Sequence, residues 1–194
     1  MPIRMATAGD AGAVRAIYAP VVESTAVSFE LAVPSEDEMA ARIADRQPAY
    51  PWLVAESARG VTGYAYAGRF AARPAYDWSA ETSVYVAETA RGQGVGRALY
   101  AALLAILAAQ GYRQAMAGIA LPNQASVALH ERAGFALVGV YRAVGWKFGA
   151  WHDVAWWQRG LAPADGVPQT PTPVDALPAD VVDVALAAGG SVHA

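Results

Sequence analysis

The sequence of 194 residues predicts a mixed α/β fold, in which helices cover the faces of one sheet. Short strand-like runs alternate along the chain with longer runs of helical periodicity. Apolar residues make up 55% of the chain, which suffices for one core and a single domain. A glycine-rich turn at residues 91–97, RGQGVGR, joins a strand-like run to the most apolar helical run, as strand–turn–helix units do.

Local signals place the elements of the N-terminal half. Residues 3–5 read as a short strand, and Asp10 is a candidate N-cap for the helix that follows. Residues 35–38, Ser-Glu-Asp-Glu, form a capping box that opens a second helix ending near Arg46. Three strands are expected next, over residues 52–56, 61–70 and 81–86.

The C-terminal half continues the alternation. A helix runs from the glycine turn to about residue 110, and Gly111 is its stop signal. After a strand at 114–120, Asn123 or Ser126 caps a helix that ends before Gly134. The last two strands are expected over 135–144 and 151–161. The predicted order is therefore β-α-α-β-β-β-α-β-α-β-β.

The composition changes after residue 161. Five prolines are spaced through residues 162–194, and alanines and acidic residues replace the aromatic pattern. We therefore expect a domain over 1–161 and a Pro- and Ala-rich tail over 162–194, with a weak helix near residues 181–187.

Composition also excludes several classes of function. A net charge of −3 without a long basic run argues against nucleic acid as a partner. The absence of cysteine removes disulfides, thiolate nucleophiles and zinc–thiolate sites. The N-terminus has no apolar signal region, and the longest apolar run is too short to cross a bilayer, so we expect a cytoplasmic protein. No His, Asp and Glu cluster has the spacing of metal ligands, and His193 is discounted because it lies in the tail.

The glycine turn is a candidate phosphate site, because glycines let the backbone approach a phosphate at the positive end of a helix. A GxGxxG dinucleotide fingerprint fails, since Arg97 or Leu99 stands where its last glycine belongs and no acid follows before Glu131. A P-loop would need a Gly-Lys-Ser/Thr sequence, which is absent. The alternatives are another phosphate-bearing ligand and a tight turn with no ligand.

What fits is R-x-x-G-x-G at 91–96, which resembles the acetyl-CoA motif of the GNAT N-acetyltransferase superfamily. The predicted element order resembles the fold of that superfamily over residues 2–161. The segments AYDWSAETSVYV (75–86), LPNQASVALHERAGF (121–135) and WKFGAWHDVAWWQ (146–158) look like the phosphinothricin N-acetyltransferase family, whose relatives act on methionine sulfone and sulfoximine. The resemblance implies acetyl-CoA as co-substrate, a small-molecule amine as acceptor and a homodimer.

The resemblance also assigns roles. Glu81 matches the proposed general base, which takes the proton of the amine. His130 stands where most GNAT enzymes carry a tyrosine that protonates the leaving thiolate, and whether it is acid or base stays open. Because the chain lacks cysteine and a G-x-S-x-G motif, we expect direct attack without an acyl-enzyme. The implied donor-binding residues are Val84, Tyr85, Val86, Arg91, Gly92, Gln93, Gly94, Val95, Gly96, Arg97 and Asn123, the last of which is equally well read as a helix cap.

The acceptor side rests on fewer residues. Arg73 and Tyr76 match basic and aromatic residues that hold the acid groups of the acceptor, but Ala71 stands where relatives often carry a basic residue. The other implied contacts are Phe29 and one of Thr82 and Ser83, because neighbouring strand residues face opposite sides. His152, among tryptophans, is read as structural or as part of a dimer interface.

Two other functions stay open. A GNAT enzyme could acetylate an aminoglycoside, a polyamine or a peptide N-terminus, although Arg73 disfavours a polyamine. A non-catalytic acyl-CoA-binding module is the second alternative, and the presence of both Glu81 and His130 disfavours it.

Overall fold

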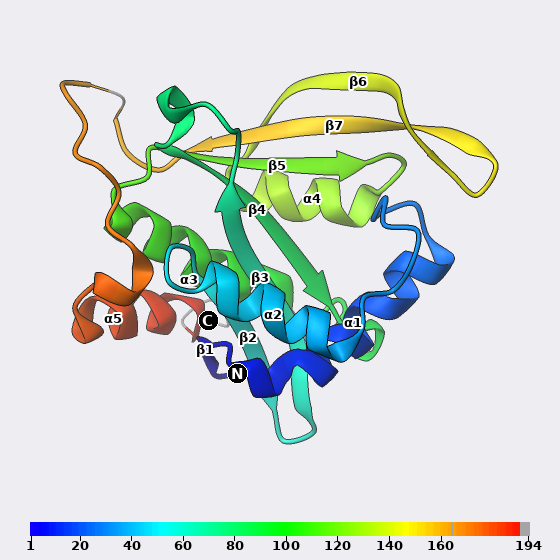
Figure 1. The fold of residues 1–194 in the computed structure, drawn as a ribbon, viewed down its shortest axis with the longest axis horizontal. Coiled ribbons are helices and arrows are strands. Elements are labelled where there is room, and N and C mark those ends of the chain that lie inside the picture. The colour runs from blue at the N-terminus through cyan, green and yellow to red at the C-terminus, as the bar shows by residue number, and fades with distance from the viewer. Residues whose placement is uncertain (164, 191–194) are drawn as a thin grey trace.

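The computed structural model describes residues 1–163 and 165–190; His193 lies outside them. The described chain forms one seven-stranded sheet of order β1-β2-β3-β4-β5-β7-β6 (Figure 1). Its strands are β1 (Ile3–Met5), β2 (Trp52–Ser57), β3 (Gly60–Arg69), β4 (Ser79–Val86), β5 (Gln114–Ala120), β6 (Ala136–Lys147) and β7 (Ala150–Gly160). The helices are α1 (Ala11–Ser24), α2 (Glu36–Arg46), α3 (Val95–Gln110), α4 (Gln124–Arg132) and α5 (Ala179–Gly190). The mixed α/β fold and the predicted element order are confirmed, and α5 follows at the end.

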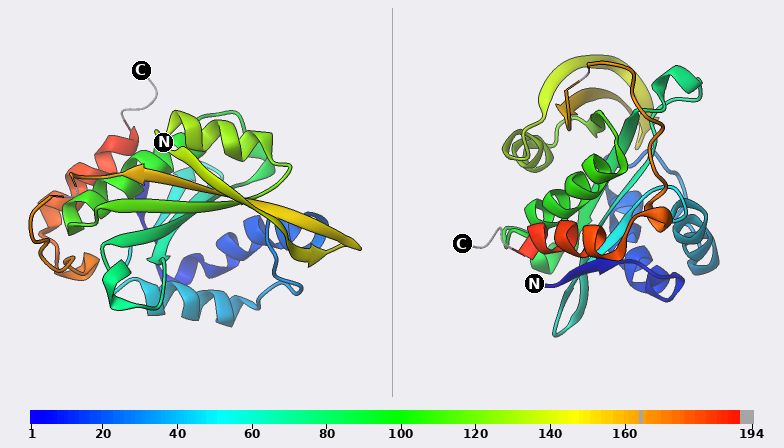
Figure 2. Two further views of the ribbon diagram at one scale, coloured as in Figure 1. Left: turned by 90° about the horizontal axis from the view of Figure 1, so that it is seen from above. Right: turned by 90° about the vertical axis from the view of Figure 1, so that its left-hand side faces the viewer.

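Helices cover the sheet on both faces, as Figure 2 shows. The alternation of β2 assigns its residues to two apolar clusters. Trp52 and Val54 pack with residues of α1 and α2, whereas Leu53 and Ala55 pack with residues of α3. The sheet is therefore buried on both sides around β2, β3 and β4.

The junction of β4 and β5 is the irregular part of the sheet. Every other strand pair is antiparallel, but β4 and β5 run parallel and pair only over three positions, from Ser79 with Gln114 to Glu81 with Met116. Beyond Glu81 the two strands diverge like the sides of a V (Figure 1). On its other side β4 stays paired with β3 up to Val86. Beyond Glu81, β4 is therefore paired on one side only, although it lies inside the sheet.

The capping box of α2 forms as predicted. The Ser35 hydroxyl accepts a hydrogen bond from the Glu38 backbone N–H at 3.1 Å, and the Glu38 carboxylate accepts one from the Ser35 N–H at 2.6 Å. The helix ends at Arg46, also as predicted. This end lies over β3, since the Arg46 guanidinium carbon is 4.8 Å from the centroid of the Tyr66 ring.

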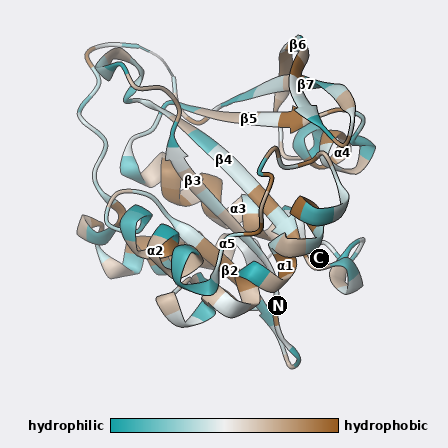
Figure 3. Ribbon diagram, turned by 45° about the vertical axis from the view of Figure 1, so that its right-hand side comes forward, coloured by the Kyte–Doolittle hydropathy of each residue, from teal (hydrophilic) through white to brown (hydrophobic). Residues whose placement is uncertain are grey.

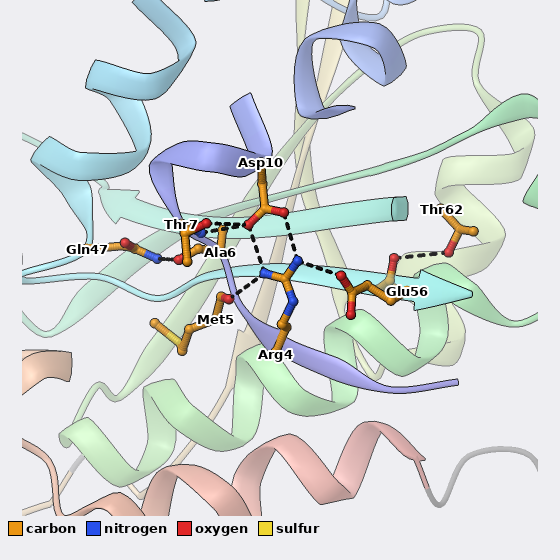
Figure 4. A network of polar contacts seen from close by, with 9 residues as sticks. Arg4, Met5, Ala6, Thr7, Asp10, Gln47, Glu56 and Thr62 are labelled. Atoms are coloured by element: carbon orange, nitrogen blue, oxygen red, sulfur yellow. Dashed lines mark hydrogen bonds and ion pairs between the residues drawn. The ribbon is translucent and has the colours of Figure 1, made fainter. Parts of the chain in front are cut away.

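Asp10 occupies the N-cap position of α1, but its side chain makes no capping bond, which corrects the expected role. The carboxylate instead receives two hydrogen bonds of 2.8 Å from the Arg4 guanidinium and one from the Thr7 N–H (Figure 4). Arg4 also pairs with Glu56 of β2. Because of the Arg4 bonds, the pKa of Asp10 falls to about 2. The network ties β1 to β2 and to the start of α1.

The segment after β7 packs back onto the domain. The Trp78 indole N–H donates to the Gln169 carbonyl at 2.8 Å, and the Gln110 amide donates to the Thr172 carbonyl at 2.8 Å. The helix expected near residues 181–187 is α5, which lies along α3 and buries Ala185 (Figure 1). The proposed domain boundary after residue 161 stays a prediction.

We expect Asp10→Asn to lower the free energy of unfolding at pH 7 by about 2 kcal/mol. The folded-state pKa of Asp10 lies below its ordinary value of 3.8, so its ionised form stabilises the fold above about pH 4. This stability is lost as the pH falls towards 2. Urea unfolding of the wild type and the variant between pH 7 and pH 2.5 measures the difference.

The exposed Asp183 on α5 offers the matched control, since Asp183→Asn removes a charge without this network. A difference between wild type and Asp10→Asn that is equally large at pH 7 and pH 2.5 would contradict an ionic origin.

Candidate active site

A pocket opens where β4 and β5 diverge. Residues of both strands, of α3 and α4, and of the loop after α1 line it: Val27, Thr82, Ser83, Val84, Tyr85, Tyr100, Gly118, Ile119, Ala120, Asn123, Ser126 and His130. We call it the split pocket. Because β5 no longer pairs with this part of β4, an extended ligand can run along the strand edge and meet its backbone polar groups.

The glycine turn uses its glycines for two purposes. Gly92 and Gly94 have φ of +74° and +80°, a left-handed backbone that side chains rarely adopt. Gly96 lies inside α3, where an added Cβ would lie 3.0 Å from a methyl group of Leu129, so it lets α4 approach α3. Arg91 and Arg97 are exposed on either side of the helix start. The turn therefore offers backbone N–H groups, positive charge and an open approach to a phosphate-bearing ligand.

Asn123 is the N-cap of α4, which settles the choice between Asn123 and Ser126 as the cap. Its side-chain oxygen accepts a hydrogen bond from the Ser126 N–H at 3.1 Å. The same residue lines the split pocket, so capping leaves it in contact with the expected ligand space.

A buried polar chain lies against the split pocket. Nε2 of His130 and the Tyr100 hydroxyl are 2.7 Å apart, and the Tyr100 hydroxyl lies 3.4 Å from Thr82 Oγ1. The Thr82 hydroxyl donates to the Met116 carbonyl at 3.0 Å. All three side chains are at least 95% buried. The chain thus connects α4, α3 and the two diverging strands.

The hydrogen bonds determine which His130 nitrogen carries the proton. Nδ1 lies 2.7 Å from the Ser126 carbonyl, which can only accept, so Nδ1 is protonated and Nε2 accepts from Tyr100. Burial lowers the pKa of His130 below its ordinary value. The imidazole is therefore neutral near pH 7, and both of its nitrogens have partners within the protein.

Glu81 lies on the opposite face of the sheet. It lines a cavity of about 410 Å³ with residues of α2, the loop after it, β3 and β4: Asp45, Arg46, Ala49, Tyr50, Tyr66, Gly68, Arg69 and Ser83. We call it the acceptor-side cavity. Burial raises the pKa of Glu81 above its ordinary value, and the nearby charge of Arg46 opposes that rise. Ser83 lines both this cavity and the split pocket, so the two meet at β4.

The structure therefore separates several residues that the sequence grouped together. Glu81 and His130 lie on different faces of β4 rather than side by side. Thr82 faces Tyr100 and His130, whereas Ser83 shares the face of Glu81. Phe29, Arg73 and Tyr76 line neither of the two pockets; Arg73 and Tyr76 lie exposed around the short turn Pro74–Tyr76.

Phe29 belongs to the loop between α1 and α2, which the β6–β7 hairpin holds in place. The buried Lys147 ammonium donates to the carbonyls of Val22 and Ser28 at 2.7 and 2.8 Å. The Phe29 ring lies so close to Gly145 that an added Cβ would be 2.2 Å from it. His152 donates to the Lys147 carbonyl at 3.0 Å, which is a structural contact inside the hairpin.

The sequence analysis missed Tyr100, Lys147 and Arg46. Tyr100 looks like one more core residue of an apolar helix, and its neighbours Thr82 and His130 are distant in sequence. Lys147 reads as an ordinary solvent-exposed cation of a strand end. Arg46 stands in the last turn of α2, where a basic residue usually needs no further explanation.

Within residues 1–163 and 165–190, no group of three or more His, Cys, Asp or Glu side chains could hold a metal ion. In the same part of the chain, no helix is both long and apolar enough for a membrane span.

The comparisons with known proteins agree with this geometry. The profile of the Acetyltransferase (GNAT) domain matches residues 3–156. The chain belongs to the GNAT acetyltransferase family. It is 43% identical over 172 residues to the phosphinothricin N-acetyltransferase of Streptomyces viridochromogenes, with 89% of this chain and 92% of that protein covered.

A second relative is the L-methionine sulfoximine/L-methionine sulfone acetyltransferase of Pseudomonas paraeruginosa, which is 38% identical, with 86% of this chain and 98% of that protein covered. The crystal structure of a phosphinothricin acetyltransferase from Sinorhizobium meliloti in complex with acetyl-CoA has a TM-score of 0.84 and 39% identity, covering 90% of this chain and 96% of that one. The protein is therefore an acetyltransferase that uses acetyl-CoA, and the fold expected from the resemblance is confirmed.

Proposed function

We propose that the enzyme acetylates the α-amine of a small amino-acid analogue, with phosphinothricin, methionine sulfoximine and methionine sulfone as acceptors. The observation that carries the proposal is the half-buried Glu81 carboxylate, which lines a cavity that meets the split pocket at Ser83. The names of the two relatives supply the acceptor class.

The residues around the split pocket fit the donor. The unpaired edge of β4 at Val84–Val86 suits the pantetheine arm, and its N–H groups are candidates for stabilising the oxyanion. The turn 91–97, with left-handed Gly92 and Gly94 and the start of α3, suits the pyrophosphate. When bound, acetyl-CoA supplies a thioester that an amine can attack directly.

Glu81 is the proposed general base. An α-amine is largely protonated near neutral pH and must lose a proton before it can attack. A half-buried carboxylate with a raised pKa holds a proton better than an exposed one, which makes it a more effective acceptor for that proton. Ser83, on the same face, lies between this carboxylate and the split pocket.

His130 is proposed to take part through Tyr100. In its neutral form Nε2 carries no proton, so His130 can accept one from the Tyr100 hydroxyl but cannot donate one itself. The Tyr100 hydroxyl, whose one proton points to Nε2, can take up a proton from the split pocket as it passes its own proton to His130. This arrangement favours His130 as a proton acceptor and disfavours it as the direct acid.

The alternatives fit less well. A polyamine site would be lined mainly by acids, yet the acceptor-side cavity carries Arg46 and Arg69 beside Asp45 and Glu81. A non-catalytic binding module would have no need of a carboxylate with a raised pKa in that cavity.

A homodimer is proposed from the exposed apolar side chains of β6 and β7 and of the turn between them. Leu137, Val138, Tyr141, Val144, Trp146, Phe148 and Trp151 are each more than half exposed. Figure 3 shows hydrophobic residues along this hairpin, which forms one end of the sheet. Exposed apolar side chains gathered on one hairpin are typical of a contact surface between proteins. The cytoplasmic location stays a prediction.

The acceptor class is tested by thiol release from acetyl-CoA. We expect turnover with phosphinothricin, methionine sulfoximine or methionine sulfone at a kcat/KM well above that for polyamines, aminoglycosides and ordinary amino acids. Mass spectrometry of the product should show one added acetyl group on the α-amine. If none of the three acceptors is turned over, the proposed acceptor class is wrong.

For Glu81→Gln we expect kcat to fall roughly 100-fold or more, with the KM for acetyl-CoA near that of the wild type, because the amide cannot take the proton. The acidic limb of the pH profile of wild-type kcat/KM should lie above the ordinary pKa of a glutamate, since burial raises the pKa of Glu81. Activity is lost as the pH falls through that limb, and the variant should lack it. Steady-state kinetics from pH 5 to 9 measure both.

The exposed Glu23 on α1 provides the control, since Glu23→Gln removes the same charge at a residue that lines neither pocket. A Glu81→Gln variant that loses affinity for acetyl-CoA while keeping its kcat would assign Glu81 a structural role.

For the dimer, we expect sedimentation equilibrium of the wild type to give about twice the chain mass of 20.2 kDa. Trp151→Glu should give the monomer mass, because a charge in a desolvated contact is costly. The exposed Val184 of α5 serves as the control, since Val184→Glu should leave the mass unchanged. A monomeric wild type would refute the proposed contact.

A further inference from the structure

The acceptor-side cavity contains an arginine that forms no ion pair in the part of the chain that the structure describes. Arg46 lines the cavity at the end of α2 and is half-buried. Within residues 1–163 and 165–190, its guanidinium makes no hydrogen bond or ion pair to another side chain. The other arginine of the cavity, Arg69, is paired with Asp77 at 3.0 Å. Arg46 is thus the cation of this cavity with its hydrogen-bond donors available.

Aromatic rings hold the Arg46 side chain in place. Its guanidinium carbon lies 4.8 Å from the centroid of the Tyr66 ring and 6.0 Å from that of Trp52. These two rings stack on each other with centroids 4.4 Å apart. A guanidinium that lies on a ring face keeps the N–H groups at its edge free for a planar oxyanion.

The strand register places this guanidinium beside Glu81. Tyr66 and Gly68 of β3 are paired with Ser83 and Glu81 of β4, and all four residues line the cavity. A Cβ on Gly68 would lie 2.5 Å from Nη1 of Arg46, so the glycine leaves room for the guanidinium directly across from Glu81. Residues paired across an antiparallel ladder are close neighbours. A carboxylate and a guanidinium therefore share one wall of the cavity without bonding each other.

We propose that Arg46 is the anion-binding residue of the acceptor-side cavity and holds an acid group of the amino-acid acceptor while its amine lies at Glu81. The proposal rests on the proposed function, because it names the substrate contact of that same site. An amino acid carries a cationic amine and an anionic carboxylate a few bonds apart, and the cavity presents the opposite charges side by side. Arg46 would thus supply a positive charge in place of the basic residue that relatives often carry at the position of Ala71.

The test compares acceptors with and without the acid group. We expect Arg46→Met, which keeps an apolar stem over Tyr66, to raise the KM for methionine sulfone and phosphinothricin roughly tenfold or more. The KM for acetyl-CoA and kcat should change little. Arg46→Lys should retain part of the affinity, and Gly68→Ala should weaken acceptor binding because its methyl group displaces the guanidinium.

Methionine sulfone carboxamide distinguishes the two acid groups. If Arg46→Met removes the preference of the wild type for methionine sulfone over its carboxamide, Arg46 holds the α-carboxylate. If it weakens phosphinothricin alone, Arg46 holds the side-chain acid. Either result supports the proposal. An equal effect on the acid and the carboxamide, or no effect on either acid, would overturn it.

Two controls distinguish a failure of the role proposed for Arg46 from a failure of the proposed function. The exposed Arg59, in the turn before β3, gives Arg59→Met, which removes the same charge and should leave every KM unchanged. Calorimetric binding of methionine sulfone without acetyl-CoA needs no turnover, so it reports on Arg46 even if the wild type acetylates none of the three acceptors. Failure of the wild type to bind methionine sulfone and phosphinothricin would itself refute the role of Arg46. Thermal melts of each variant confirm that it is folded.

Discussion

The early end of the pairing between β4 and β5 is the constraint on which the rest of the site depends. A strand edge inside a sheet leaves backbone N–H and C=O groups without their usual partners, which is costly unless water or a ligand meets them. The Thr82 hydroxyl makes the first adjustment, since it bonds the carbonyl of Met116, the last β5 residue to pair with β4. Tyr100 and His130 then fill the space behind Thr82. The incomplete sheet is thus stabilised by a side-chain network at the point where it opens.

The two faces of β4 present different side chains to the split pocket and to the acceptor-side cavity. Thr82 and Val84 point towards α3 and α4, whereas Glu81 and Ser83 point towards α2. A shift of the strand by one residue would exchange the two sets, so the ladder with β3 is what assigns each chemical group to its side. The β6–β7 hairpin adds a second constraint, because Lys147 fixes the loop that carries Val27 into the split pocket.

The sequence predicted the fold well because its signals are local. The capping box at Ser35 and the glycines at 92 and 94 need only their immediate neighbours to be understood. The capping role predicted for Asp10 is wrong, because its carboxylate bonds Arg4 of the preceding strand rather than its own helix. The packing of α5 on α3 was not foreseen, since the prolines between residues 163 and 178 are also typical of a linker.

The residues of the site could be predicted only where a sequence motif contains them. Glu81 and His130 could be picked out individually, but their placement on opposite faces depends on the register of β4 with β3 and β5. Arg46 could not be picked out from the sequence, because its position in the cavity depends on Gly68. Only a residue without a side chain leaves room there for the guanidinium. A larger residue at position 68 would occupy the space of the guanidinium, so the charge pattern opposite Glu81 depends on both positions together. The charge pattern of this cavity therefore depends on pairs of residues on neighbouring elements, which a pattern along one strand or helix does not contain.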